Sequence, residues 1–589
     1  KRRLYSPSHH SHSASRVRSQ RNRSTGPARK PRRLSLQGAA ASRRKGAADA
    51  AMVRGVVLVV LLKAIVASEM YVERDTAGGR VRGTVLRAAG RNVEQYRGIP
   101  FAEAPIGELR FRPPRPREPW TGTLDATAST AATACPQVEI DGLGMQGVTY
   151  TEDCLRLNVW VPESVVCLST SRPVLVWIHG GGFNFGSATQ ANYSGATISA
   201  MADLLVVSMN YRLGILGFMS ADSPEAPGNV GLLDQLMALQ WVQRNIASFG
   251  GDPKRVTLFG ESAGAASAHA HVLSPMSEGL FRRAVLMSGS MSSIDMWDMV
   301  HESMAKGSKV ADIVGCSKGG SIDLSSNADE IVHCFRRKSA DELVRAAAES
   351  VAPKFTAFLP TYHDSFLPRM PLAAVKRGFF GPVDILAGVT SDEAAFPFLA
   401  SAKPELLTED LEASEGLADD LNAAVSAWLK FDTPGIIDKY TANAPKGDGN
   451  ALRRRYIDYL SDRMFNCPLR FLAEMHSARD NNVFVYVFSH KSPTAPFPSW
   501  MGAPHTSDLE YAFGHAYAQQ PDSPDGRMSG AFVRILATFA ESGVPELPSG
   551  QKWPKYTRSS PVVVTMGHGQ FNETRGFRES ECERWKSVI

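Results

Sequence analysis

A serine between glycines is the feature of the sequence with the clearest chemical potential. Gly260, Ser262 and Gly264 form the pattern G-x-S-x-G in "VTLFGESAGAAS", after the apolar run "VTLF" and before "AASAHAHVL". This order predicts a strand, a sharp turn and a helix, a geometry that exposes a nucleophilic serine hydroxyl. The pattern is weak alone, since a glycine-rich strand end with an ordinary serine has the same letters. The apolar run before the motif and the helical segment after it favour a nucleophilic serine over an ordinary one.

Three consecutive glycines, residues 180–182, occur upstream in "VWIHGGGFNFG". A loop without side chains lets backbone N–H groups approach a developing oxyanion. A phosphate-binding loop is not indicated, because the Lys-Ser/Thr of that motif is missing. The glycines therefore predict an oxyanion-binding turn rather than a plain one.

A serine hydroxyl needs a base, and the base needs an orienting acid. In a strand–elbow–helix site the partners follow in the order Ser, acid, His. Asp392 and Glu393 both follow the expected strand 384–389, and His490 and His505 both follow the expected strand 483–488. Position alone does not choose within either pair.

The helices and strands expected around these residues indicate an α/β fold. Amphipathic helices are expected at 231–249 and 531–543, each ending at a glycine. Short apolar runs predict strands, several of them buried on both faces; they lie at 174–178, 204–209, 256–259, 284–287, 384–389, 483–488 and 561–566. The alternation predicts a large, mostly parallel central sheet flanked by helices. Residues 69–589 read as one domain, with insertions around 295–355 and 400–465.

The first 68 residues have a different composition from the rest. Residues 1–51 hold fourteen Lys or Arg and one acidic residue, so the net charge of +6 conceals a mildly acidic body. We expect this tail to be disordered and absent from the mature protein, with translation starting at Met52, rather than to be a nucleic-acid-binding arm. Residues 52–68 have the layout of a secretory signal and are too short to span a bilayer. The protein is therefore predicted to be secreted, with no transmembrane segment and no nucleic-acid partner.

The cysteines and sequons agree with an extracellular protein. Pairing neighbours along the chain gives Cys135–Cys154, Cys316–Cys334 and Cys467–Cys582, and leaves Cys167 free. Metal-type spacing is absent, so neither a metal nor a cofactor is expected. Asn192 and Asn572 begin glycosylation sequons.

Several long segments resemble one family. "YRGIPFAEAPIGELRF", "EDCLRLNVW", "HGGGFNFG", "NYRLGILGF", "VTLFGESAGAAS", "GVTSDEAAF" and "GAPHTSDLEYAFG" are similar to the type-B carboxylesterase/cholinesterase family of α/β-hydrolases, over about residues 72–586. The resemblance implies a serine esterase acting on small esters through an acyl-enzyme. It assigns the nucleophile to Ser262, the acid to Glu393 and the base to His505. His490 then occupies a noncatalytic strand end.

The resemblance also implies the surroundings of this triad. The oxyanion donors would be the N–H groups of Gly181, Gly182 and Ala263, and Glu261 and Phe396 would line the substrate gorge. The family's three disulfides match the neighbour pairing above.

The substrate is expected to be a general carboxylic ester rather than a choline ester. Cholinesterases carry a tryptophan in the first disulfide loop, which holds the quaternary ammonium by a cation–π contact. The corresponding loop here, "CPQVEIDGLGMQGVTYTEDC", has only Tyr150 as an aromatic residue. An acetylcholinesterase-like enzyme is the alternative, and a noncatalytic adhesion or binding protein of the same fold is a third.

Overall fold

A computed structural model describes residues 70–127, 132–139, 145, 147–163, 171–354, 357–396, 398 and 403–588. They lie in one compact unit that spans Glu69–Ile589. The tail 1–51, the predicted signal peptide 52–68 and Cys167 lie outside the described residues.

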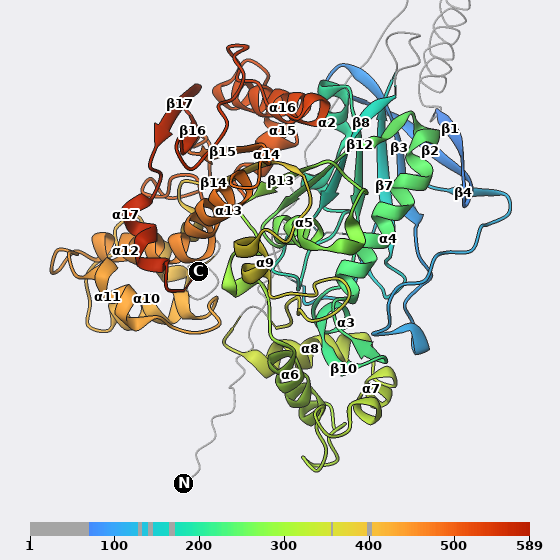
Figure 1. The fold of residues 1–589 in the computed structure, drawn as a ribbon, viewed down its shortest axis with the longest axis horizontal. Coiled ribbons are helices and arrows are strands. Elements are labelled where there is room, and N and C mark those ends of the chain that lie inside the picture. Colours follow the sequence, from blue (N-terminus) through green and yellow to red (C-terminus); the bar gives the residue numbers. More distant parts are fainter. Residues whose placement is uncertain are drawn as a thin grey trace, which may run out of the picture. The chain divides into compact units, whose positions relative to one another are not determined.

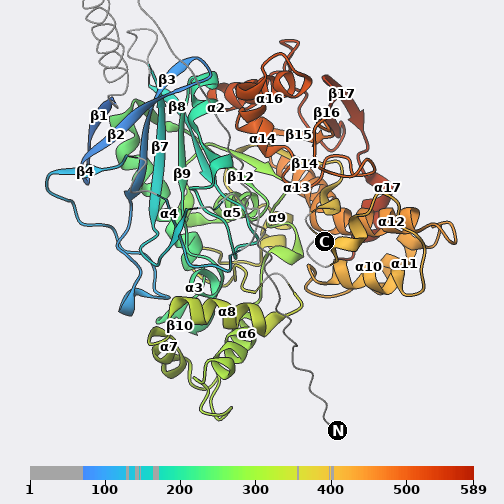
Figure 2. The same cartoon turned by 180° about the vertical axis from the view of Figure 1, so that it is seen from behind.

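A large sheet runs through the unit (Figures 1 and 2). Within the described residues it has 13 strands, in the order β1-β2-β3-β7-β9-β8-β12-β13-β14-β15-β16-β17, with β4 beside β2. Neighbours from β9 to β16 are parallel, and the pairs outside this range are antiparallel except β2–β4. The strands are β1 (Tyr71–Thr76), β2 (Gly79–Ala88), β3 (Arg91–Pro100), β4 (Thr123–Asp125), β7 (Arg156–Pro162), β8 (Arg172–Ile178), β9 (Leu205–Met209), β12 (Gly251–Glu261), β13 (Arg283–Met287), β14 (Asp384–Thr390), β15 (Val483–Phe488), β16 (Val562–Gly567) and β17 (Gln570–Arg575). The predicted fold class is confirmed.

Two short ribbons complete the described strands, β5 (Thr133–Ala134) with β6 (Thr149–Tyr150) and β10 (Ser220–Ser223) with β11 (Ala226–Pro227). The α-helices are α2 (Ala196–Ala202), α3 (Gly214–Phe218), α4 (Val230–Asn245), α5 (Ala263–Leu273), α6 (Val300–Ile313), α7 (Ala328–Arg336), α8 (Ala340–Val351), α9 (Pro371–Arg377), α10 (Leu417–Ser426), α11 (Pro434–Thr441), α12 (Gly449–Ser461), α13 (Cys467–Ser477), α14 (Leu509–Ala512), α15 (His515–Gln519), α16 (Pro524–Ser542) and α17 (Glu579–Cys582). Across the described part of the chain, none of these helices combines the length and apolarity needed to cross a bilayer.

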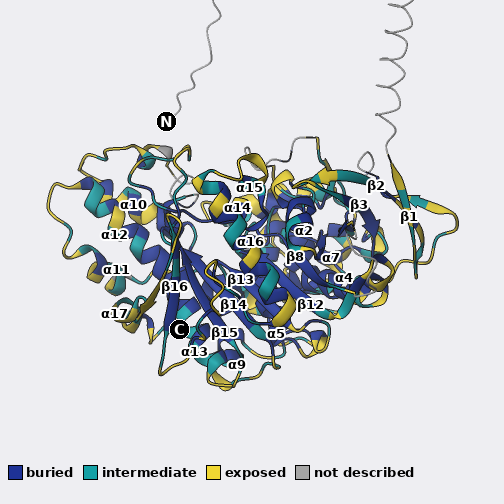
Figure 3. Ribbon diagram, turned by 90° about the horizontal axis from the view of Figure 1, so that it is seen from above, coloured by how far each residue is buried: buried dark blue, intermediate teal, exposed yellow. Residues whose placement is uncertain are grey.

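Side chains alternate across the sheet, and each face packs against its own helices. On β8, Val174 and Val176 point into the core beneath α4, α5 and α13, whereas Leu175 and Trp177 point into the core beneath α2 and α16. Both faces are thus covered, which explains the continuous apolar runs of the central strands. Figure 3 shows β13, β14 and β15 buried in the middle of the unit.

The two expected insertions are helical. Helices α6–α8 and α10–α12 form separate groups, visible in both Figure 1 and Figure 2. Helix α12 reaches the site described next, because its Ser461 hydroxyl accepts a hydrogen bond from the N–H of Ala394 at 3.1 Å.

Candidate active site

Ser262 occupies a strained turn between β12 and α5. Its φ of 56° and ψ of −123° lie where residues with a side chain are rare. The turn is possible because its neighbours are glycines: a Cβ on Gly260 would lie 2.3 Å from the Gly264 carbonyl oxygen, and one on Gly289 would lie 2.1 Å from that of Ser262. Ser262 is partly exposed, although the residues on both sides of it are buried. The predicted strand–turn–helix is present.

Glu393 and His505 meet at the carboxyl ends of the next strands. Glu393 follows β14 and is fully buried, and its Oε2 lies 2.6 Å from His505 Nδ1. Its other oxygen, Oε1, accepts a hydrogen bond from the N–H of Thr390 at 2.7 Å. Both carboxylate oxygens are therefore held, and the carboxylate fixes the orientation of the imidazole through its Nδ1.

The other two candidates point elsewhere. Asp392 forms an ion pair with Arg454 and accepts a hydrogen bond from the N–H of Ala503 at 3.2 Å. His490 Nε2 lies 2.7 Å from Asp525 Oδ1. The structure brings together only Glu393 and His505 from the two pairs that the sequence left open.

Glu261, next to Ser262, faces the second nitrogen of His505. Its Oε1 lies 3.1 Å from His505 Nε2, and both side chains are buried. Burial alone would lower the pKa of His505, but the charges of Glu261 and Glu393 outweigh it and raise that pKa. Burial also raises the pKa of Glu261, although the charge of His505 opposes this shift. The imidazole thus lies between two carboxyls that stabilise its protonated form.

The glycine loop adjoins the serine. A Cβ on Gly180 would lie 3.1 Å from Ser262 Cβ, and Gly181 and Gly182 have positive φ values of 111° and 57°. Within the described part of the chain, the N–H groups of Gly181, Gly182 and Ala263 donate to no acceptor. Three free donors therefore belong to the two segments that meet at Ser262.

An acid that the sequence analysis did not single out also belongs to this cluster. Asp508 is fully buried, and its Oδ2 accepts a hydrogen bond from the Tyr486 hydroxyl at 3.2 Å. Burial and then the charge of Glu393 raise the pKa of Asp508 to about 7. The available signal was an acid three residues after His505, immediately before the apolar turn of α14.

Aromatic side chains surround His505. Ring centroids of Phe398 and Phe465 lie 5.3 Å and 4.9 Å from the imidazole centroid. Phe396, which we predicted to line the gorge, is partly buried and packs against Phe497 at 5.3 Å. Sequence analysis missed Phe465, because it lies on an insertion far from the motifs.

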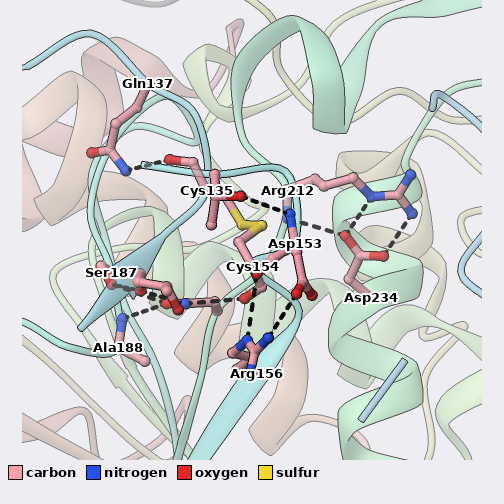
Figure 4. The surroundings of a disulfide bond; sticks show 12 residues. Cys135, Gln137, Asp153, Cys154, Arg156, Ser187, Ala188, Arg212 and Asp234 are labelled. Atoms are coloured by element: carbon pink, nitrogen blue, oxygen red, sulfur yellow. Dashed lines mark hydrogen bonds and ion pairs between the residues drawn. A yellow bond between two sulfur atoms is a disulfide. The ribbon is translucent and has the colours of Figure 1, made fainter. Parts of the chain in front are cut away.

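The first disulfide loop contacts the glycine loop. Cys135 and Cys154 are bonded, and the Gln137 side chain both accepts from the N–H of Gly186 at 2.8 Å and donates to its carbonyl at 2.9 Å. Figure 4 shows this disulfide with Gln137 and the neighbouring Ser187. The described part of the loop thus braces the loop that carries the free donors.

The remaining predicted sites lie as follows. The disulfides Cys316–Cys334 and Cys467–Cys582 are also present, so all three predicted bridges are confirmed. Asn192 and Asn572 are both exposed.

Comparison with known proteins gives a consistent result. A family model described as "Carboxylesterase family" matches residues 71–585. An acetylcholinesterase of Bungarus fasciatus is 35% identical over 549 residues, which cover 89% of this chain and 87% of that protein. A cholinesterase of Mus musculus is 34% identical over 555 residues, covering 90% and 89%. Together with the fold and the geometry around Ser262, these matches show that the chain belongs to the carboxylesterase family of α/β-hydrolases, whose members are serine hydrolases of carboxylic esters.

Proposed function

We propose that the protein is a secreted serine carboxylesterase in which Ser262 is the nucleophile, His505 the base and Glu393 the orienting acid. The observation that carries the proposal is the 2.6 Å contact between Glu393 Oε2 and His505 Nδ1, in the same cluster as the strained Ser262. Glu393 fixes the ring so that Nε2 is the atom that exchanges the proton.

In the proposed reaction, His505 Nε2 takes the Ser262 proton while the hydroxyl oxygen attacks the ester carbonyl. The N–H groups of Gly181, Gly182 and Ala263 stabilise the negative charge on the carbonyl oxygen. The alcohol leaves with the proton from His505, and water then hydrolyses the acyl-enzyme with the same residues in reversed roles. The carboxyl of Glu261 stabilises the imidazolium formed in each half.

Changing Ser262→Ala tests the nucleophile. We expect hydrolysis of p-nitrophenyl acetate to fall by about 10⁶-fold, because only the oxyanion donors and substrate binding remain. A fluorophosphonate probe should label the native chain and fail to label the variant. Turnover or labelling retained by the variant would refute the assignment, and a native chain that neither turns over nor labels would favour the noncatalytic binding protein.

A choline esterase is the second candidate, since two relatives are named acetylcholinesterase and cholinesterase. The lack of tryptophan between Cys135 and Cys154 argues against it, because no indole in this loop can hold a quaternary ammonium. We expect kcat/KM for p-nitrophenyl acetate and butyrate to exceed that for acetylthiocholine. A strong preference for acetylthiocholine would reverse the substrate assignment.

The proposal also covers the secretion and processing of the protein. Residues 52–68 serve as the signal peptide, residues 69–589 form the mature enzyme, and Asn192 and Asn572 carry glycans. Their exposure and the three disulfides support an extracellular location. Neither a cofactor nor a metal takes part in the proposed chemistry.

A further inference from the structure

A surface pocket lies at the edge of the sheet opposite Ser262, with a volume of about 710 Å³. Ser262 follows the carboxyl end of β12, whereas Lys254 is near the amino end of that strand and Arg282 directly precedes β13. The seven residues from 255 to 261 extend roughly 20 Å. The pocket is therefore separate from the candidate active site. We call it the α5–α9 pocket, because its lining includes the last turn of α5 and residues just before and just after α9. The two helices themselves lie side by side in Figures 1 and 2.

One part of the wall of the α5–α9 pocket is apolar. Val272 and Leu273 from the last turn of α5 line it, together with the rings of Phe281, Phe379 and Phe380. Phe379 exposes 41% of its surface, an unusual exposure for a residue of that size. The pocket thus offers flat aromatic surface to a bound molecule.

Three cations surround these rings without carboxylate partners. Lys254, Arg282 and Arg369 are exposed, and no carboxylate of the described residues lies within 4.0 Å of their charged groups. The guanidinium of Arg369 lies over the Phe379 ring, 4.0 Å from its centroid. Glu278 is the one acid among the lining residues. Positive charge therefore concentrates here, on a body that is otherwise mildly acidic.

We propose that the α5–α9 pocket binds an amphiphilic monoanion, a molecule with one anionic headgroup and an apolar body. The headgroup would pair with Arg282 and Arg369, and the body would lie against Phe379 and Phe380. Arginine suits this role because it binds a carboxylate through two parallel hydrogen bonds. A concave site of this volume matches a single small molecule, and a flat bilayer would not fill it.

The test uses the full chain and dodecanoate that carries a terminal diazirine. After irradiation, we expect crosslinks within residues 272–281 or 378–383, and their loss when unlabelled dodecanoate is added in excess. Combining Arg282→Ala with Arg369→Ala should reduce this labelling at least tenfold. The matched control combines Arg337→Ala with Arg345→Ala, which removes two exposed charges, one just after α7 and one on α8, and should leave labelling unchanged.

Three crosslinking results would overturn the proposal. These are crosslinks found only near Ser262 or His505, equal labelling by the diazirine analogue of dodecylamine, and labelling that survives in the Arg282/Arg369 variant. Binding to phosphatidylserine vesicles without pocket labelling would assign the charges to a membrane surface and would also refute it. The variant should keep native hydrolysis of p-nitrophenyl acetate, so that a failure here is separable from a failure of the proposed esterase activity.

Discussion

Asp392 and Glu393, which both follow strand β14, have carboxylates with different partners. Glu393 contacts the imidazole of His505, whereas Asp392 binds Arg454 and the backbone of Ala503. Both acids are buried and both follow β14, so burial does not distinguish them. The two acids differ in the direction of their side chains, because only the side chain of Glu393 reaches His505.

This difference predicts unequal effects of two isosteric changes. Glu393→Gln should lower kcat for p-nitrophenyl acetate by about 10⁴-fold, because an amide neither fixes the tautomer of His505 nor stabilises its charge. Asp392→Asn should lower kcat less than about tenfold, since it weakens an ion pair whose arginine is 44% exposed. Steady-state kinetics of both variants, with far-UV circular dichroism to check folding, measures the contrast. If the Asp392 change alone silenced the enzyme, the acid assignment would be wrong.

At the scale of elements, the first disulfide loop and the glycine loop form a pair. The Gln137 side chain joins the two loops by two hydrogen bonds to Gly186. Gly186 lies four residues after Gly182, so the join is close to the proposed oxyanion donors. The disulfide loop thus has a mechanical role that is independent of its lack of tryptophan.

Changing Gln137→Ala should loosen the glycine loop without unfolding the protein. Two lost hydrogen bonds are worth about 1–3 kcal/mol, which corresponds to roughly a tenfold fall in kcat if the loss acts on the transition state. KM should change little, because the donors act mainly on the developing charge. The matched control is Gln240→Ala on the exposed side of α4. An unchanged kcat, or a fall confined to KM, would contradict the bracing role.

At the scale of the whole molecule, the sequence predicted the fold class and the parallel centre of the sheet, whereas β1–β4, β7 and β17 were not among the expected strands. Its apolar runs are the central strands, and Gly250 and Gly543 end helical segments in the left-handed conformation, as expected. Helix α16 begins at Pro524 rather than near 531, because Ser523 caps it and Pro524 fits its first turn; the "SPDG" letters alone resemble a turn.

The candidate site was less accessible to sequence reasoning. The residues alone left Asp392 beside Glu393 and His490 beside His505, since side-chain direction at a strand end is a tertiary property. Asp508 was missed for the same reason. Its spacing from His505 was visible in the sequence, but its raised pKa depends on burial beside Glu393, which is a tertiary property.

Neutral histidines buried in the core link the stability of the whole molecule to pH. His269 Nδ1 accepts the N–H of Met291 at 3.2 Å, so the ring proton is on Nε2, which lies 3.1 Å from His476 Nε2. A second proton on either ring would set N–H against N–H. Burial lowers the pKa of His269 to about 3. The folded state therefore resists protonation that the unfolded chain accepts near pH 6.5, and this histidine stabilises the fold less as the pH falls from 6.5 towards 3.

Buried acids have the opposite effect on stability, because the raised pKa of Asp508 makes the folded state more stable as the pH falls. The contribution of His269 is therefore measured by comparing variants at the same pH. His269→Gln keeps a donor toward His476 but does not titrate. We expect it to cost about 1–3 kcal/mol of unfolding free energy at pH 7.5. That deficit should shrink by about 2 kcal/mol at pH 5.0. At this pH the unfolded chain with His269 binds a proton that the folded chain does not, so the native protein loses stability, whereas the Gln variant has no group to protonate at this position. Urea unfolding at both pH values measures it, with the exposed His301→Gln as control. A deficit independent of pH would mean that His269 titrates alike in the folded and unfolded chains, and that its burial does not contribute to acid sensitivity.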